Sequence, residues 1–519
     1  MTEYDPEVTK AIASRPALVE YFGIEGLYGY RSISLTSKFA ATVLIAKNGS
    51  GKTTLLGAMD AFLKRQFGRL SELDFKRIEC RLRGVEETLV LEKNDLDELM
   101  EISDSSEVFR AAKLNDIEPS ELVHFLIGEY DGLKQNSLEL MEHPVFRKIH
   151  RQSRHTLPTA KDFFNELEVK LSARSTRLEH LQRLLRNALR DYEIVYLPTY
   201  RRIELSLPEE AEEPITGRRS TSIHSRLGLN RRGLHAGDIQ FGVTDISHRL
   251  EQLNKNMLFE SNQGYGEISA NIINDLINGS FDRDVPSLEE RPTKEALSLF
   301  FLRLKQGRKL WRHHPSYSDF EIPDVERIYR EESVSENSRK FLTYFLGKLD
   351  TVMQKTRDVE SAVEEFVNNC NRYLSAPDES VQIPGSALVG GANEDSKVLR
   401  LDRQNLAVTV SSLVAKREIP LDALSSGEKQ MISLFARLYL YPKRKIVLID
   451  EPELSLSIDW QRKILLDIVN AKQCEQVVAI THSPFVFDNP LEPFATAMRL
   501  QIEAAPDSGE EEQGDPIHE

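Results

Sequence analysis

The residues best suited to chemistry lie in a glycine-rich loop near the N-terminus, with the sequence Ala-Lys-Asn-Gly-Ser-Gly-Lys-Thr over residues 46–53. Its glycines let backbone N–H groups turn toward phosphate oxygens, and a helix that starts just after the loop adds the positive end of its dipole. Lys52 would then reach the β- and γ-phosphates of a nucleotide, and the Thr53 hydroxyl would bind Mg²⁺. The expected nucleotide-binding residues are Asn48, Gly49, Ser50, Gly51, Lys52, Thr53 and Thr54.

The segments on either side of this loop support the phosphate-binding interpretation. The apolar run 41–45 predicts a buried strand, and residues 55–63 have helical apolar spacing. Strand, loop and helix form the context that a phosphate loop needs. Ala46 stands where this loop usually has its first glycine, and alanine fits there only if its φ is negative. The alternative is a chance glycine turn before a helix.

A pair of carboxylates, Asp450 and Glu451, follows a second apolar run at residues 446–449. In parallel sheets, ligands and metals collect at the carboxyl ends of the strands, where these side chains are expected to lie. Asp450 would hold Mg²⁺, and Glu451 would orient and deprotonate an attacking water. Alternatively, the strand simply ends in a solvated acidic pair.

Two further segments carry polar residues at the ends of expected elements. Ser425 and Ser426 are candidate N-caps of a helix through residues 431–440, and a capped helix start is also a site for an anion. His482 follows the apolar run 477–480, and it either contacts a ligand or is a structural histidine at a strand end. Each segment therefore has both a structural and a ligand-binding interpretation.

Together these four segments resemble, in type and order, the ATP site of ABC-type ATPases of the SMC-like and OLD-like classes. The resemblance implies an α/β fold in which an ABC-type head, a mixed sheet with a P-loop, is interrupted by a helical or short coiled-coil insertion. It also implies that ATP and Mg²⁺ are the cofactors. Two copies of the chain would hold ATP between them in a homodimer or a higher homo-oligomer.

The resemblance also implies roles for single residues. Contacts with the nucleotide of a partner chain fall to Ser425, Gly427 and Glu428, catalysis to Glu451 and His482, and Mg²⁺ to Thr53, Asp450 and Gln240. Gln240 is the candidate for the family's glutamine loop, and the alternative is an ordinary surface glutamine. Ser457 stands where OLD-like ATPases usually carry Asp or His.

The long stretch between the glycine-rich loop and the serine-glycine segment at residues 424–428 sets the expected domain limits. We expect an N-terminal ATPase lobe at 1–204, a helical arm at 205–375, a C-terminal ATPase lobe at 376–490 and a partly disordered acidic tail at 491–519. Helical spacing recurs in the arm, but sustained heptads are too few for a long rod, so a compact or short arm is expected.

Apolar spacing predicts several further elements. Short antiparallel strands are expected between residues 21 and 39. Two further strands are expected near 398–401 and 406–410, before the serine-glycine segment. Leucines from 167 to 189 predict one amphipathic helix, and a strand is expected to follow at residues 194–198.

The 519-residue chain has the composition of an ordinary soluble protein, with 40% apolar and 29% charged residues. No apolar stretch approaches the roughly 20 residues that cross a bilayer, and there is no signal-peptide core, so a cytoplasmic location without membrane contact is expected. Cys80, Cys370 and Cys474 show no metal-ligand spacing, and we interpret them as buried small hydrophobes.

The formal net charge of −15 argues against indiscriminate binding of nucleic acid over the whole surface. Arginines nevertheless cluster between residues 174 and 232. Both a contact with DNA or RNA and a solvated basic helix face are open interpretations of this cluster.

From the N-terminal strands to the Thr-His-Ser-Pro sequence at 481–484, the chain resembles the ATPase subunit of Septu-type antiphage defence systems, including their retron-associated forms. That resemblance implies a slow ATPase that acts as sensor and scaffold and regulates a separate nuclease subunit of the HNH type. Two alternatives stay open: an SMC-like DNA-repair ATPase that clamps DNA, and an ATP-binding assembly module with little turnover.

Overall fold

The computed structural model divides the chain into two compact units. It describes residues 6–47, 49–100, 106–134, 140–141, 143–152, 156–172, 175–198, 243–278, 291–310, 322–330, 336–375, 396–454 and 456–502. The first unit comprises Met1–Gln240 and Lys443–Glu519, and the second comprises Phe241–Pro442. The domain limits expected at residues 204, 375 and 490 stay predictions.

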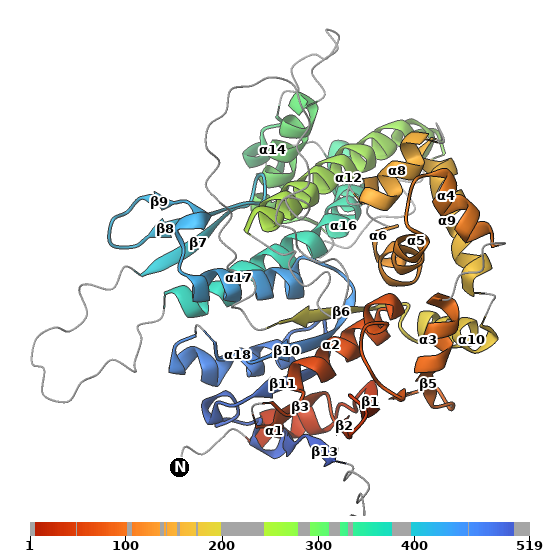
Figure 1. Cartoon of the computed structure of the whole chain (residues 1–519). Helices are drawn as coiled ribbons and strands as arrows, with labels where there is room; N and C mark the ends of the chain where they lie inside the picture. The colour runs from red at the N-terminus through yellow and green to blue at the C-terminus, as the bar shows by residue number, and fades with distance from the viewer. Residues whose placement is uncertain are drawn as a thin grey trace, which may run out of the picture. The chain divides into compact units, whose positions relative to one another are not determined.

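The core of the first unit is a five-stranded sheet in which all neighbouring strands are parallel (Figure 1). Across the sheet the strands are β12 (Ala495–Ala497), β3 (Ala41–Ile45), β11 (Cys474–Thr481), β10 (Arg444–Asp450) and β6 (Tyr192–Leu197). The central strands are near-continuous apolar runs because a parallel sheet is covered on both faces. The strands expected at the motifs and near residue 195 are confirmed.

A second five-stranded sheet in this unit is antiparallel. Its strands are, in order, β13 (Arg499–Ile502), β2 (Arg31–Thr36), β1 (Val19–Leu27), β4 (Arg77–Leu82) and β5 (Leu89–Glu92). The short strands expected between residues 21 and 39 are confirmed as β1 and β2. The expectation of a mixed sheet with the P-loop is wrong for the described strands, because the sheet that contains β3 is parallel throughout and the antiparallel pairs form a second sheet. A short turn can join the antiparallel pair of β1 and β2, whereas the parallel neighbours β10 and β11 are connected through a helix at residues 458–470.

Helix α2 (Lys52–Leu63) begins directly after the glycine-rich loop and packs on β10 and β6. Every residue from 55 to 63 is buried. The same core includes alternate residues of β3, β10 and β11, namely Leu44, Ile446, Leu448, Val478 and Ile480. Helix α18 (Ile458–Asn470) packs on β11. The N-terminus of α2 is therefore held at the strand ends by the burial of the helix behind it.

Between β5 and β6 the chain folds into a run of mostly short helices. They are α3 (Lys93–Met100), α4 (Glu107–Leu114), α5 (Pro119–His124), a π-helical turn (Phe125–Glu129), α6 (Tyr130–Leu133), α8 (Pro144–Gln152), α9 (Leu157–Ser172) and α10 (Thr176–Ala188). The single helix expected from 167 to 189 is wrong, because Ser175 caps a new helix by accepting a hydrogen bond from the Leu178 N–H. Leucines of both helices join one core, so their spacing did not reveal the break.

Smaller elements complete the first unit. They are α1 (Pro6–Ala13) and 3-10 turns at Phe67–Leu70, Pro484–Val486 and Glu492–Phe494. Cys80 and Cys474 of this unit and Cys370 of the second unit are buried, as predicted. No helix of the described residues combines the length and the apolar character needed to span a membrane.

The second unit is built on two long helices that pack against each other, α12 (Val243–Ile277) and α16 (Glu336–Leu374). At 1.5 Å per residue they are about 52 and 58 Å long, so these helices are longer than the short arm that was expected. Gly264 lies within α12. In the structure this glycine permits close packing, since a Cβ there would lie 2.6 Å from Val352 Cγ1.

Shorter helices and a small sheet complete the second unit. They are α14 (Lys294–Leu310), α15 (Val325–Tyr329), β7 (Lys397–Asp402), β8 (Ala407–Ser412), β9 (Glu418–Ile419), a 3-10 turn (Leu421–Ala423) and α17 (Ser426–Tyr439). Strands β7, β8 and β9 pair antiparallel, which confirms the two strands expected before the serine-glycine segment. Helix α17 confirms the helix expected after Ser425, and it packs on α16 and α12 (Figure 1).

Candidate functional site

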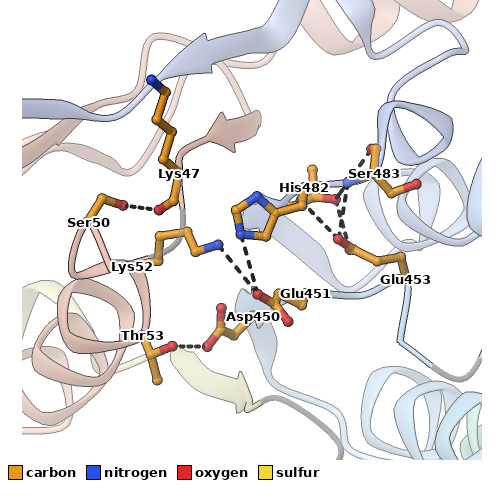
Figure 2. A network of polar contacts seen from close by, with 10 residues as sticks. Lys47, Ser50, Lys52, Thr53, Asp450, Glu451, Glu453, His482 and Ser483 are labelled. Atoms are coloured by element: carbon orange, nitrogen blue, oxygen red, sulfur yellow. Dashed lines mark hydrogen bonds and ion pairs between the residues drawn. The ribbon is translucent and has the colours of Figure 1, made fainter.

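Three neighbouring strands of the parallel sheet end at one edge and bring the motif residues of the first unit together. β11 lies between β3 and β10, and the register pairs Thr481 with Ile45 and Asp450 with Ile480. The loop after β3, the acidic pair at the end of β10 and His482 after β11 therefore meet at this edge (Figure 2). The sequence predicted each strand end, but not the order of the strands.

The glycine-rich loop has the backbone conformation that its residues predict. Gly49 and Gly51 have φ angles of 78° and 92°, in the left-handed region that favours glycine. Gly51 is the N-cap of α2 and no side chain caps it, so the first N–H groups of the helix can face an anion. Ala46 is not among the described residues with positive φ, which is why alanine fits there. The Ser50 hydroxyl donates to the Lys47 carbonyl at 2.7 Å and closes the turn.

A lysine, a glutamate and a histidine form the charged centre of the site. The Nζ of Lys52 lies 3.4 Å from Glu451 Oε1, and the Lys52 residue is only 6% exposed. His482 Nε2 lies 3.7 Å from the same oxygen. Figure 2 shows both side chains pointing toward Glu451. This arrangement gives the carboxylate one fixed cation and one group that can carry a proton, so it can orient a water molecule and take up its proton.

The backbone of Glu451 is in an unusual conformation. Its φ is 53°, in the left-handed region that non-glycine residues rarely adopt. The Glu451 N–H donates to the Ile480 carbonyl at 2.8 Å, which continues the pairing with β11 for one residue beyond β10. Such strained residues are held by their surroundings and cluster at functional sites. The sequence carried no signal for this feature.

The two side chains expected to bind Mg²⁺ touch each other. The Thr53 hydroxyl donates to Asp450 Oδ2 at 2.6 Å, and Asp450 is 2% exposed. Oxygen atoms of a hydroxyl and a carboxylate are the ligands that Mg²⁺ prefers, and it usually completes its shell with water and substrate phosphates. The pair therefore fits such an ion. Among the described residues, no group of three or more His, Cys, Asp and Glu side chains could hold a metal alone.

Glu453, two residues after Glu451, connects the loop after β10 to the loop after β11. Its Oε1 accepts hydrogen bonds from the N–H groups of His482 at 2.9 Å and Ser483 at 3.2 Å. Its Oε2 accepts one from the Thr481 hydroxyl at 2.8 Å. Burial, followed by the negative charge of Glu451, raises the pKa of Glu453 although these hydrogen bonds oppose the rise. No local pattern in the sequence predicts these hydrogen bonds.

The same two loops are joined a second time through α18. Gln461 donates to the carbonyls of Leu456 and Glu453 at 3.0 and 3.3 Å, and its Oε1 accepts from the Ser483 hydroxyl at 2.8 Å. Ser457, the residue that departs from the family pattern, is the N-cap of α18 but makes no side-chain capping bond. Glu453 and Gln461 thus fix the main chain on both sides of His482.

We expect Glu453→Ala to lower the free energy of unfolding by about 1–3 kcal/mol, because three hydrogen-bond donors lose their acceptor. Glu453→Gln keeps an acceptor oxygen and removes a charge that burial disfavours, so it should be at least as stable as the wild type at neutral pH. A raised pKa means that the folded state binds this proton before the unfolded state does. Burial of the charged carboxylate therefore lowers the free energy of unfolding of the wild type at neutral pH, and this loss disappears as the pH falls through the raised pKa.

Denaturant unfolding at neutral and mildly acidic pH checks this prediction. The difference in free energy of unfolding between the wild type and Glu453→Gln should shrink on acidification. The free energy of unfolding of Glu453→Ala should already be lower than that of the wild type at neutral pH. A Glu453→Ala protein as stable as the wild type would show that the three hydrogen bonds contribute little.

An arginine and two tyrosines lie beside the glycine-rich loop. Arg31 Nη1 donates to the Gly49 carbonyl at 3.1 Å. The Arg31 guanidinium lies 4.9 Å from the ring centroid of Tyr28 and 5.5 Å from that of Tyr30. The tyrosines are 46% and 47% exposed, so planar groups are available for stacking next to the loop. No sequence motif had pointed to these three residues.

The serine-glycine segment starts helix α17 in the second unit. Ser425 is the N-cap: its Oγ accepts from the Glu428 N–H at 3.3 Å, and Glu428 Oε2 accepts from the Ser425 N–H at 2.7 Å. The expected cap is therefore confirmed. A hydroxyl that accepts a hydrogen bond still has its own proton to donate, so the capping role leaves Ser425 able to contact an anion.

Some of the residues expected at the site lie outside the described part of the chain. Asn48 and Gln240 lie outside the described residues, as do the arginines from 201 to 232 and Arg174. Thr54 lies in the first turn of α2 and is half-buried. Exposed arginines on or just after α10 are Arg177, Arg183, Arg186 and Arg190.

Comparison with known proteins adds two matches. A family model described as "AAA ATPase domain" matches residues 22–487, which include all four motif segments. No curated protein matches the chain. Among solved structures, the crystal structure of the Smc head domain with an extended coiled coil bound to the C-terminal domain of ScpA, derived from Pyrococcus furiosus, is similar. The identity is 13% and the TM-score 0.31, and the match covers 93% of this chain and 96% of that chain.

Proposed function

We propose, because this chain belongs to the AAA ATPase domain family, that it binds ATP with Mg²⁺ at the carboxyl edge of its parallel sheet and hydrolyses it there. One observation supports the proposal: the glycine-rich loop, the acidic pair and His482, which follow three neighbouring strands, contact one another at the same edge of the sheet. Each motif alone has a structural explanation. Their contact in space is what favours catalysis.

The ion pair between Lys52 and Glu451 suggests how the site responds to ATP. Lys52 Nζ lies 3.4 Å from Glu451 Oε1. A triphosphate beside the loop would draw Lys52 to its β- and γ-oxygens, with the first N–H groups of α2 as further donors. Glu451 would then be free to accept a hydrogen bond from water. The triphosphate itself thus prepares the general base.

Hydrolysis would follow by attack of this water on the γ-phosphorus. The proton of the water passes to Glu451, and the bond to the bridging oxygen of ADP breaks while Lys52 stabilises the leaving charge. Thr53 and Asp450 would hold Mg²⁺, which when bound neutralises charge on the β- and γ-oxygens. His482, 3.7 Å from Glu451, would contact the γ-phosphate or the water.

We further propose that a second copy of the chain completes the site with the start of its helix α17. Ser425, Gly427 and Glu428 would face the γ-phosphate held by the partner's phosphate loop. The resemblance to SMC-like ATPases and the capped helix start support this view. ATP would then join two chains, and slow hydrolysis would separate them and move α12 and α16.

The wider role that we propose is that of a sensor and scaffold which regulates a separate HNH-type nuclease in antiphage defence. Its support is the resemblance to Septu-type ATPase subunits. The alternative of an SMC-like ATPase that clamps DNA is favoured by the exposed arginines of α10. Copurification of a nuclease, and phage protection that requires Lys52, would support the first role. ATP turnover stimulated by DNA alone would support the DNA-clamping role. An absence of phosphate release would favour the third alternative, an ATP-binding assembly module with little turnover.

A mixing experiment tests the shared site. Each proposed ATP site consists of the phosphate loop of one chain and the start of α17 of the other. Lys52→Ala disables the phosphate loop and Ser425→Arg blocks the start of α17, so each variant alone should be inactive. In a dimer of one copy of each, the Ser425→Arg chain supplies an intact phosphate loop and the Lys52→Ala chain an intact α17. A phosphate-release assay of an equal mixture should recover about a quarter of the wild-type rate, since half of the random dimers carry one intact site of two.

The control replaces the Ser425→Arg chain by one that carries both substitutions. That mixture contains no intact site and should stay inactive. A first mixture as inactive as the control would contradict a site shared between two chains, whereas activity of Ser425→Arg alone would show that α17 is not required.

A further inference from the structure

An ion pair is built into the start of helix α17. The Nζ of Lys397 lies 3.0 Å from Oε1 and 2.9 Å from Oε2 of Glu428, so the lysine contacts both carboxylate oxygens. The two side chains are only 17% and 15% exposed. An exposed ion pair contributes little, but partial burial strengthens the interaction of these charges with each other and with a nearby ligand.

Glu428 has two functions that conflict at this helix start. Its carboxylate completes the capping box by accepting the Ser425 N–H, which stabilises the first turn. The same carboxylate places a negative charge within one turn of the N–H groups that would face the triphosphate of a partner chain. Without compensation, this charge would repel the ligand for which the helix start is proposed.

Lys397 supplies the compensating charge from a different element. It is the first residue of β7, where it pairs with Ser412 of β8. Leu399, two residues along the strand, is held by Asn371 of α16, which donates to the Leu399 carbonyl at 2.9 Å and accepts from the Leu399 N–H at 2.7 Å. The position of the lysine is thus set by the long helix α16.

The other end of α17 is tied to the second long helix. Arg249 of α12 donates through Nε to the carbonyl of Leu440, the C-cap of α17, at 3.0 Å. Its guanidinium also lies 4.6 Å from the ring centroid of Tyr441. Since α12 and α16 pack together, both ends of α17 are bonded to one helical framework.

We propose that Lys397 is a positioning residue for the shared ATP site: it neutralises Glu428, so that the capped start of α17 can accept the triphosphate bound to a second copy of this chain. The inference rests on the proposed function. It assigns to β7 the task of connecting the long helices to the ATP site. A shift of α16 that moves β7 would separate Lys397 from Glu428 and weaken the contact between the two chains.

A double-mutant cycle tests this role. Lys397→Met keeps the length and apolar stem of the lysine without its charge, and Glu428→Gln removes the charge that the lysine is proposed to neutralise. The measurement is the dimer dissociation constant with ATP and Mg²⁺, in a Glu451→Gln background that prevents turnover. Lys397→Met should weaken the dimer on the order of tenfold or more when Glu428 is present, and Lys397→Arg should restore it.

Glu428→Gln will itself set a new dimer dissociation constant. In that background, Lys397→Met should not change the dimer dissociation constant further. A lysine that acted independently of Glu428 would act equally in both backgrounds. Binding of a fluorescent ATP analogue by the single chain, which needs the phosphate loop but not α17, should be unchanged by Lys397→Met. Thermal unfolding of each variant checks that the chains are folded.

The outcomes separate this inference from the function on which it rests. A wild-type dimer that forms with ATP, together with equal effects of Lys397→Met in both backgrounds, would overturn the role of Lys397 alone. Weaker binding of the analogue by the single Lys397→Met chain would overturn it as well. A chain whose association does not depend on ATP would overturn both.

Discussion

Lys52→Ala is expected to abolish ATP hydrolysis and to weaken ATP binding on the order of 10- to 100-fold. The lysine is nearly buried at the N-terminus of α2, where no side chain caps the helix. Its removal deletes the fixed cation that would face the β- and γ-phosphates, and it also removes the ion pair with Glu451. Titration with a fluorescent ATP analogue measures binding, and a phosphate-release assay measures turnover.

Lys47→Ala is the matched control for this substitution. It removes the same charge from the same loop, but the Lys47 side chain is exposed and points away from Glu451 (Figure 2). We expect ATP affinity and turnover within about threefold of the wild type, since surface charges act weakly through solvent. Equal losses in the two variants would mean that the loop acts through its overall charge and that Lys52 has no special position.

Glu451→Gln is expected to reduce turnover by about 10²- to 10⁴-fold, the range that a positioned general base contributes. Glutamine has nearly the same shape but cannot take the proton from water. ATP binding should persist, because the phosphate loop, Lys52 and the pair of Thr53 and Asp450 are unchanged. Bound ATP should therefore hold two chains together, and light scattering with ATP and Mg²⁺ should detect a dimer or larger oligomer that outlasts the wild-type complex.

Glu453→Gln is the comparison for this variant, since it neutralises a neighbouring carboxylate that holds the main chain near His482. Its turnover should fall by about tenfold at most, because an acceptor oxygen remains, and no long-lived oligomer should form. If Glu451→Gln hydrolysed ATP at the wild-type rate, Glu451 could not be the base. A trapped oligomer in both variants would point to a general effect of lost charge.

Local patterns in the sequence were sufficient to predict many elements. The strands β3, β10 and β11 follow from short apolar runs, and α2 and α17 follow from helical spacing after a glycine loop and a serine cap. These features depend on neighbouring residues and on backbone preferences, such as the left-handed conformation of Gly49 and Gly51. That is why they could be located without the tertiary structure.

The errors arose where spacing is ambiguous or where a contact is distant in sequence. One expected helix proved to be α9 and α10, because leucines on two helices in one core continue the same spacing across the cap at Ser175. A short arm was expected because sustained heptads are few, but two long helices can also pack closely through small residues such as Gly264, where a Cβ would lie 2.6 Å from Val352 Cγ1. Glu453 was missed because its partners lie about 30 residues away and are mostly backbone groups.

The sequence by itself determined a glycine-rich loop between a strand and a helix, a carboxylate pair at a strand end, a capped serine-glycine helix and a histidine after a strand. Only the tertiary structure decided that β11 lies between β3 and β10 and that Lys52 and His482 both face Glu451. It alone revealed that Lys397 pairs with Glu428. The physical reason is that strand order and side-chain contacts depend on how crossovers and helices pack over hundreds of residues, whereas turns, caps and strand ends depend on a few adjacent ones.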